Sequence, residues 1–333
     1  DPPHPPDLLW EQTLAPIRHT LSSPTESASS PRIHQKGGTL VAVPFDPHAP
    51  FQEYAHPERL VSASWLSARL GTPGLRVIES DEDSLLYDIG HLPGAVRIDW
   101  QKDLNDPVTR DIIDGEAFAA LMNSKGIARD DTVVIYGDQS NWWAAFTLWV
   151  FELFGHEDVR LLDGGRDAWM AEERDTSFVV PEYPSADYPV VERNDADYRV
   201  FVTEMLEQIG SATIVDVRSL EEYNGLLGDG EEPAVAPTLR KGHIPTAVNL
   251  PWQDNVHPNS RFRSRAELDE LYSSLDPAAD TTVYCHVGDR TAHTWFVLKY
   301  LLGFDSVRNY DGSWVEWGNM VRMPIAQGEA PHA

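Results

Sequence analysis

The one cysteine of this 333-residue chain, Cys285, lies in a segment whose residue types could support nucleophilic chemistry. Residues 284–291 read Tyr-Cys-His-Val-Gly-Asp-Arg-Thr, between a β-branched strand at 282–284 and an apolar helix expected at 292–302. A loop from a parallel strand to a helix lies at the carboxyl edge of the sheet, where open α/β folds bind ligands. Backbone N–H groups and a helix N-terminus at that edge favour an anion, and they can lower a cysteine pKa from ~8.5 to ~3.5–7.5.

These features predict that Cys285 is a catalytic nucleophile. A lone cysteine is more often a small buried apolar residue. In this segment, however, Gly288 lets the backbone wrap around the sulfur and Arg290 supplies positive charge. Neither residue is needed by a cysteine that only fills space.

The elements that position this segment follow an alternating pattern. Apolar or β-branched runs at 75–78, 132–136, 159–162 and 214–217 predict strands, and the runs 116–125 and 143–154 predict helices. Strands that alternate with helices at this spacing form a parallel sheet with helices on its faces. The predicted fold class is therefore α/β.

The pattern occurs twice, which predicts a tandem duplication. Residues 242–248 match 90–96, and residues 282–284 and 307–314 match 134–136 and 159–166 at a constant offset of 148. We expect a Pro- and Ser-rich disordered tail at 1–57, a first domain at 58–173, a linker at 174–197 and a second domain at 198–328. At the offset of 148, Cys285 corresponds to Gly137, so the first domain lacks the nucleophile and is expected to wall the cleft of the second.

With these motifs, residues 60–325 resemble the tandem-domain rhodaneses, which are thiosulfate:sulfur sulfurtransferases. The resemblance rests on residues 216–218 (Asp-Val-Arg), 242–245 (Gly-His-Ile-Pro), 285–290 and 311–317 (Asp-Gly-Ser-Trp-Val-Glu-Trp). It implies two rhodanese-like domains, each a mostly parallel sheet flanked by helices, of which only the second is active. Its implied chemistry is attack of the Cys285 thiolate on thiosulfate, release of sulfite, and passage of the persulfide sulfur to cyanide or a thiol. It implies no cofactor and no metal.

The remaining site residues are expected around this persulfide. The loop N–H groups of His286, Val287, Gly288, Asp289 and Arg290 would hold the sulfur, as an oxyanion hole holds oxygen. Arg290 would meet the dianionic donor with help from His286, whereas Asp289 is an unexpected negative charge that could orient Arg290. Three further cations have alternatives. Arg218 could face the cleft or form a structural ion pair, and Arg240 and Lys241 could bind the sulfonate or belong to a solvated face.

Two further motifs have structural interpretations. The Gly-His-Ile-Pro segment predicts a turn, in which His243 is not expected to act as a base because its counterpart His91 lies in the domain without a nucleophile. Residues 311–313 predict a helix entry capped by Ser313.

Composition excludes several partners. The chain has 26 Lys and Arg against 53 Asp and Glu, a formal net charge of −27, which argues against nucleic acid or an anionic membrane as a partner. One cysteine permits no internal disulfide, and no apolar run reaches the ~18 residues of a membrane span. With no signal-peptide pattern visible, we expect a cytoplasmic protein whose partners are a small-molecule sulfur donor and acceptor.

Three other functions compete with this interpretation. A 3-mercaptopyruvate sulfurtransferase usually has a small neutral loop, whereas His286 and Arg290 favour an inorganic dianion. A cysteine phosphatase or arsenate reductase places five residues between Cys and Arg, and this chain has four. A non-catalytic sulfur-binding or regulatory module would have a degenerate loop, which the second domain does not have.

Overall fold

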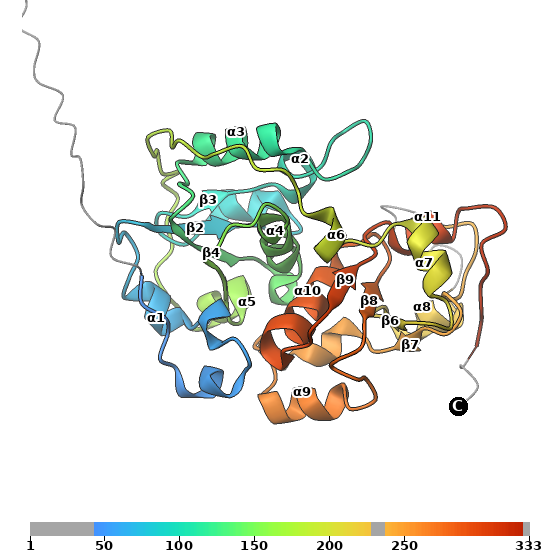
Figure 1. Ribbon diagram of the computed structural model, residues 1–333. Coiled ribbons are helices and arrows are strands. Elements are labelled where there is room, and N and C mark those ends of the chain that lie inside the picture. Colours follow the sequence, from blue (N-terminus) through green and yellow to red (C-terminus); the bar gives the residue numbers. More distant parts are fainter. Residues whose placement is uncertain (1–42, 228–236, 329–333) are drawn as a thin grey trace, which may run out of the picture. The chain divides into compact units, whose positions relative to one another are not determined.

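The computed structural model describes residues 43–227 and 237–328, which form two α/β lobes. We call residues 43–194 the N-terminal lobe and the described residues from 195 onward the C-terminal lobe. Figure 1 shows the two lobes, with the N-terminal lobe in blue to green and the C-terminal lobe in yellow to red.

Each lobe is built on one parallel sheet. The N-terminal sheet has the order β1-β5-β4-β2-β3 and the C-terminal sheet the order β7-β6-β8-β9, with every pair of neighbours parallel. The strands are β1 (Leu60–Val61), β2 (Leu75–Glu79), β3 (Val96–Arg97), β4 (Thr132–Tyr136), β5 (Val159–Leu162), β6 (Thr213–Asp216), β7 (Val248–Asn249), β8 (Thr281–Tyr284) and β9 (Val307–Asn309). The predicted α/β fold class is confirmed.

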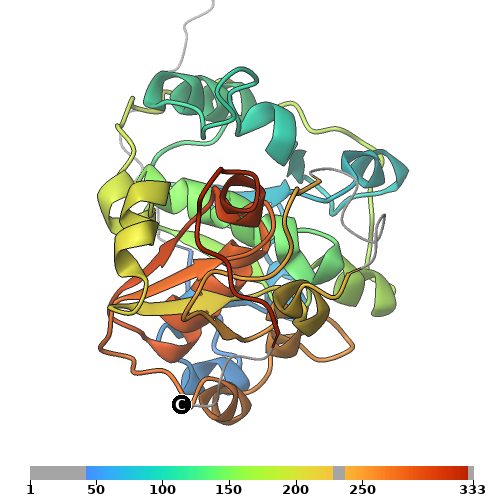
Figure 2. The same ribbon diagram turned by 90° about the vertical axis from the view of Figure 1, so that its right-hand side faces the viewer.

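Helices lie between the strands and cover the sheets. The α-helices are α1 (Ala63–Ser67), α2 (Trp100–Asp103), α3 (Gly115–Lys125), α4 (Trp142–Leu153), α5 (Gly165–Ala171), α6 (Asp195–Tyr198), α7 (Val202–Gln208), α8 (Leu220–Asn224), α9 (Arg265–Leu271), α10 (Arg290–Phe296) and α11 (Ser313–Trp317). Short 3₁₀ turns occur as η1 (Ala49–Glu53), η2 (Pro57–Arg59), η3 (Ser84–Ile89), η4 (Gln139–Asn141) and η5 (Trp252–Asn255), and a π-helix, η6 (Val297–Leu302), continues α10. Figure 2 views the C-terminal lobe from the side on which α11 faces the reader.

The duplication is visible in the packing as well as in the strand order. Tyr136 at the end of β4 and Tyr284 at the end of β8 each donate a hydroxyl hydrogen bond to an acidic residue of the neighbouring strand. Each hydroxyl also accepts the backbone N–H of the residue that follows the repeated Gly-His pair. A single parallel bridge between Arg199 and Asn309 stands at the place where β1 pairs with β5 in the first lobe.

The lobes meet through the two equivalent helices that follow β4 and β8. Helix α4 packs against α10, and one hydrophobic core runs through both lobes across this contact. The helix that leaves the Cys285 loop is therefore held by the lobe that lacks a nucleophile. The Cys285 loop is thus held at one end by β8 and at the other end by α10, which packs against the N-terminal lobe.

The predicted tail is wrong in part. Residues 1–42 lie outside the described residues, but residues 43–57 are packed rather than disordered. Their apolar side chains Val43, Phe51 and Tyr54 are buried, and the backbone N–H of Ala55 donates to the carbonyl of Leu301. Burial of these side chains is favourable enough to order a Pro-rich segment that has no periodic pattern. The other predicted domain boundaries stay predictions.

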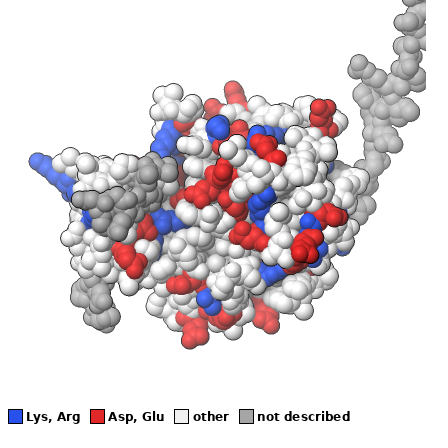
Figure 3. Space-filling model, turned by 180° about the vertical axis from the view of Figure 1, so that it is seen from behind, with Lys and Arg blue, Asp and Glu red and all other residues white. Residues whose placement is uncertain are grey.

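The surface mixes charges of both signs. On the face in Figure 3, Lys and Arg side chains lie among the Asp and Glu side chains rather than in a separate patch. Within residues 43–227 and 237–328, we find no helix with the length and apolarity that a bilayer crossing requires.

Candidate active site

Cys285 follows β8 directly and lies at the carboxyl edge of the C-terminal sheet, as predicted. Strand β8 ends at Tyr284, and helix α10 begins at Arg290. Residues 285–289 thus form a tight loop between the two elements. Gly288 has a φ of 95°, and a Cβ atom there would lie 2.1 Å from the carbonyl oxygen of Asp311. Only glycine permits this turn.

The sulfur is enclosed by the loop. Cys285 has an exposed fraction of 0%, and its Sγ accepts a hydrogen bond from the N–H of Gly288 at 3.1 Å. The backbone N–H of Thr291, at the start of α10, acts in the direction that lowers the pKa of the thiol. Gly288 is therefore shown to donate to the sulfur as expected, and the expected N–H contacts of the other residues of 286–290 stay a prediction.

The Cys285 side chain also has an acceptor. The thiol donates to Oδ1 of Asp289 at 3.1 Å, so Asp289 points at the sulfur instead of orienting Arg290. Burial first, and the Asp289 carboxylate second, raise the pKa of Cys285 to about 11, and Arg290 opposes them only in part. The expected lowering of this pKa is wrong because the sequence does not reveal how deeply the sulfur is buried.

Arg290 is engaged by a carboxylate that the sequence did not single out. Its two terminal nitrogens donate to the two oxygens of Glu222, both at 3.0 Å. Burial alone would raise the pKa of Glu222, but the guanidinium outweighs it and the pKa is lowered. Within the described part of the chain, the buried Nε of Arg290 has no hydrogen-bond partner. Arg290 therefore has one N–H donor left, at Nε, while its positive charge is balanced by the carboxylate of Glu222.

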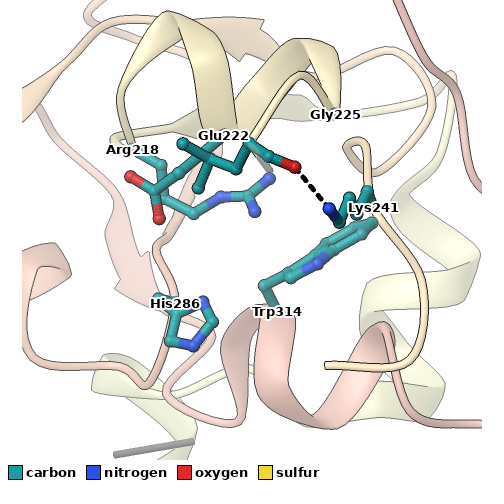
Figure 4. A pocket seen from close by; sticks show the side chains of 7 residues that line it. Arg218, Glu222, Gly225, Lys241, His286 and Trp314 are labelled. Atoms are coloured by element: carbon teal, nitrogen blue, oxygen red, sulfur yellow. Dashed lines mark hydrogen bonds between the residues drawn. The ribbon is translucent and has the colours of Figure 1, made fainter. Parts of the chain in front are cut away.

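Arg218 forms the structural ion pair that was the alternative to facing the cleft. It donates to Asp216 at 3.0 and 2.6 Å and to the carbonyl of Gly242 at 2.8 Å. Its guanidinium lies 4.6 Å from the ring centroid of Trp314. Figure 4 shows Arg218, His286 and Trp314 around a small pocket beside the loop, of about 10 Å³.

Two other predicted positions lie away from the sulfur. Arg240 donates to the carbonyls of Gly318, Trp317 and Met323, and also of Met320, which end helix α11 and follow it. This binding of carbonyls leaves the guanidinium no role at a sulfonate, so the predicted substrate contact is wrong. His243 is buried, and its Nδ1 lies 2.8 Å from the carbonyl of Tyr223, as expected of a turn residue.

Ser313 does not cap α11. Its hydroxyl accepts the backbone N–H of Cys285 at 3.1 Å and donates to the carbonyl of Tyr310 at 2.7 Å. The residue at the N-cap of α11 is Gly312. Ser313 therefore ties the start of the Cys285 loop to the end of the neighbouring strand.

A cleft between the lobes borders the other side of the loop. It has a volume of about 790 Å³, and its walls include Val287 and Asp289 of the loop and residues 105–107 and 109–112 of the N-terminal lobe. Trp100 and Trp143 also line it, with ring centroids 3.7 Å apart. The first lobe thus walls a cleft beside the loop, as expected.

Residues 62–172 and 201–320 match the rhodanese-like domain. The chain is 74% identical over 292 residues to the thiosulfate sulfurtransferase of Corynebacterium glutamicum, across 87% of this chain and 97% of that protein. The chain belongs to the rhodanese family. It is also 50% identical over 283 residues to the sulfur carrier protein TtuD of Thermus thermophilus, across 83% of this chain and 99% of that protein.

A solved structure agrees with the rhodanese fold. The crystal structure of SseA from Escherichia coli, described as a 3-mercaptopyruvate sulfotransferase, matches with a TM-score of 0.66 at 26% identity. The match covers 77% of this chain and 98% of that chain. The predicted pair of rhodanese-like domains is confirmed.

In the first rhodanese domain, the position that corresponds to Cys285 has no space for a side chain. A Cβ atom on Gly137 would lie 2.2 Å from the carbonyl oxygen of Ser80. The N–H of Gly137 donates to Oδ1 of Asn141, whose amide donates to the carbonyl of Leu162. A cysteine at this position is therefore excluded by the backbone, not only missing from the sequence.

Sequence reasoning missed two residues next to the loop. For Glu222 the sequence shows only the capping-box spacing with Ser219 at the start of α8, which does not place it beside the loop. Arg110 had no signal. It approaches from the other lobe and donates to the carbonyl of Val287 at 3.2 Å.

Proposed function

We propose that this rhodanese is a thiosulfate sulfurtransferase that carries the transferred sulfur as a persulfide on Cys285. The observation that carries the proposal is the enclosure of the chain's one thiol by a loop in which the N–H of Gly288 donates to the sulfur. The name of the 74% identical relative supports thiosulfate as the donor. The alternative donor is 3-mercaptopyruvate, and the alternative role is a sulfur-binding module.

The first step must remove a proton, because burial leaves Cys285 as a thiol at neutral pH. Asp289 Oδ1, already the acceptor of the thiol hydrogen bond, takes this proton. The pair then changes from thiol and carboxylate to thiolate and carboxylic acid. Its total charge stays the same, so an anionic donor meets no additional negative charge as the nucleophile forms.

Sulfur transfer then proceeds in two balanced half-reactions. The Cys285 thiolate attacks the outer sulfur of thiosulfate, a new S–S bond forms, and the old S–S bond breaks with its electron pair leaving on sulfite. Asp289 returns its proton to the departing sulfite. In the second half-reaction, cyanide or a thiolate attacks the terminal sulfur, and the electron pair of the Cys285–sulfur bond returns to Sγ. A proton from solvent then restores the resting thiol.

The N–H of Gly288 stabilises negative charge on this sulfur in both half-reactions. Because it is a backbone donor of the loop held between β8 and α10, it needs no reorganisation during the reaction. The loop therefore acts on the sulfur itself, and recognition of the rest of the donor falls to other groups.

The test is intact-mass measurement after incubation with thiosulfate and without an acceptor. We expect a mass increase of one sulfur atom, its removal by cyanide, and no increase in Cys285→Ser. Loading by 3-mercaptopyruvate but not by thiosulfate would transfer the proposal to the alternative donor. Loading by neither would leave only the sulfur-binding module. The cytoplasmic location stays a prediction.

A further inference from the structure

The proposed donor is a dianion, and the protein that must bind it has a formal net charge of −27. The cations that the sequence pointed to are already used. Arg290 and Arg218 each lie in an ion pair with a carboxylate, and Arg240 and Lys241 donate to backbone carbonyls. Since Asp289 adds a negative charge beside the sulfur, the donor requires a cation from another part of the molecule.

Arg110 of the N-terminal lobe meets this requirement. It lines the cleft beside the loop, its side chain is exposed, and its Nη2 donates to the carbonyl of Val287, two residues after Cys285. Among residues 43–227 and 237–328, no carboxylate lies within ion-pair distance of Arg110. Arg199, the other cation that lines this cleft, is bound by Asp111, Asp195 and Asp311.

The carboxylates of the same cleft are occupied by other donors. They are Asp106, which accepts N–H groups of its own turn; Asp111 and Asp311, which bind Arg199; Asp289, which accepts the thiol; and Glu316, which accepts the Tyr310 hydroxyl. Arg110 is therefore available to an anion that enters the cleft.

The segment that carries Arg110 is tied down on both sides. The N–H of Arg110 donates to the carbonyl of Asp106, and the N–H of Asp106 donates to the carbonyl of Asp111. Asp111 is in turn held by Arg193 and Arg199. Arg110 itself has a φ of 61°, a conformation that an arginine seldom adopts. These contacts hold the base of the side chain in place while its end reaches the catalytic loop.

We propose that Arg110, supplied by the domain that has no nucleophile, binds the sulfonate end of the anionic sulfur donor. The inference rests on the proposed function and assigns the donor-binding cation to the other domain. A guanidinium presents several N–H donors in one plane and can exchange the single Val287 carbonyl for two sulfonate oxygens. The donor then lies with its sulfonate on Arg110 and its outer sulfur toward Cys285. The first domain is thereby a substrate-binding partner as well as a wall.

The experiment measures the rate of persulfide formation by acid quench and intact mass at increasing donor concentration. The proteins are wild type, Arg110→Gln, Arg110→Lys and the control Arg322→Gln, since Arg322 is exposed and does not line the cleft. The donors are thiosulfate, a dianion, and benzenethiosulfonate, a monoanion. Dithiothreitol then discharges preformed persulfide, a step in which no sulfonate takes part. Calorimetric titration of thiosulfate into Cys285→Ser protein with and without Arg110→Gln measures binding without turnover.

We expect Arg110→Gln to lower the second-order rate constant with thiosulfate by about tenfold or more, the low end for a charge-assisted hydrogen bond. The loss should be smaller with benzenethiosulfonate, and Arg110→Lys, which keeps the charge but not the planar pair of donors, should recover only part of the rate. Salt should slow wild type more than Arg110→Gln. Equal losses in loading by both donors and in discharge would mean that Arg110 only supports the loop, and would overturn the proposal. An unchanged rate or unchanged thiosulfate binding would overturn it as well.

The two proposals fail separately. If thiosulfate binds Cys285→Ser protein and Arg110→Gln abolishes that binding, but no persulfide forms on wild type, the proposed function fails and the anion site stands. If wild type is loaded normally and Arg110→Gln is loaded equally well, the anion site fails and the proposed function stands.

Discussion

Asp289→Asn is expected to lower the pKa of Cys285 and, at the same time, to slow its loading by thiosulfate. The carboxylate oxygen lies 3.1 Å from Sγ. At that distance, Coulomb's law gives ~1.3 kcal/mol even in the dielectric constant of water, and more at ~20. An energy of ~1.4 kcal/mol is one pKa unit. Burial and the Asp289 carboxylate together raise the pKa of Cys285 to about 11. Because burial persists in the variant and the carboxylate does not, we expect the pKa of Cys285 to fall by about one unit or more.

The assay is the pH dependence of alkylation by iodoacetamide, because the thiolate is the reacting form. Below both pKa values, the alkylation rate of the variant should exceed that of wild type by about tenfold or more. Loading by thiosulfate should change in the opposite direction, since an asparagine cannot accept the thiol proton. Asp305→Asn, an exposed position before β9, serves as the control.

An unchanged or higher pKa in Asp289→Asn would refute the electrostatic part of this reasoning. If loading by thiosulfate rose in parallel with alkylation, the variant would show that Asp289 only restrains the thiol and does not accept its proton. The two measurements therefore separate the charge of Asp289 from its proton transfer.

Three further predictions concern the surroundings of the loop. Gly137→Cys in a Cys285→Ala background should form no persulfide. Its free energy of unfolding by urea should fall by about 2 kcal/mol, because the new Cβ would meet the Ser80 carbonyl. Persulfide formation on this variant would contradict the explanation. Glu222→Gln should cost about 3 kcal/mol or more in the same assay because Arg290 stays buried without its carboxylate, and a loss like that of the exposed control Glu270→Gln would contradict it. Burial lowers the pKa of His293 from 6.5 to about 3, so the unfolded state binds this proton first and the free energy of unfolding falls as pH drops from ~6.5 toward ~3, by at most ~1.4 kcal/mol per unit. His293→Gln should flatten this fall in pH-dependent urea titrations, and an unchanged slope would count against it.

The fold and the position of the nucleophile could be predicted from the sequence because both depend on local patterns. β-branched runs and the repeat at an offset of 148 locate β4, β5, β8 and β9, and the strand-to-helix junction locates Cys285. The lack of a nucleophile in the first domain also follows from the aligned Gly137. These features need no knowledge of how distant segments pack.

The electrostatics of the site could not be predicted, because they depend on tertiary contacts. A sequence does not show that Glu222 reaches Arg290, that Arg240 binds the carbonyls near α11, or that the thiol faces Asp289. Each of these contacts changes which charges remain for a substrate. Arg110 was missed for the same reason, since its approach to Val287 crosses from one lobe to the other.

The measurement that tests the central claim most directly is the release of sulfite from thiosulfate in the absence of any acceptor. Stoichiometric persulfide formation on Cys285 predicts a rapid burst of one sulfite per chain, followed by no further release until cyanide or a thiol is added. Cys285→Ser protein should give no burst. Sulfite that appears only when the acceptor is present would contradict the persulfide intermediate, because sulfur would then pass directly from donor to acceptor.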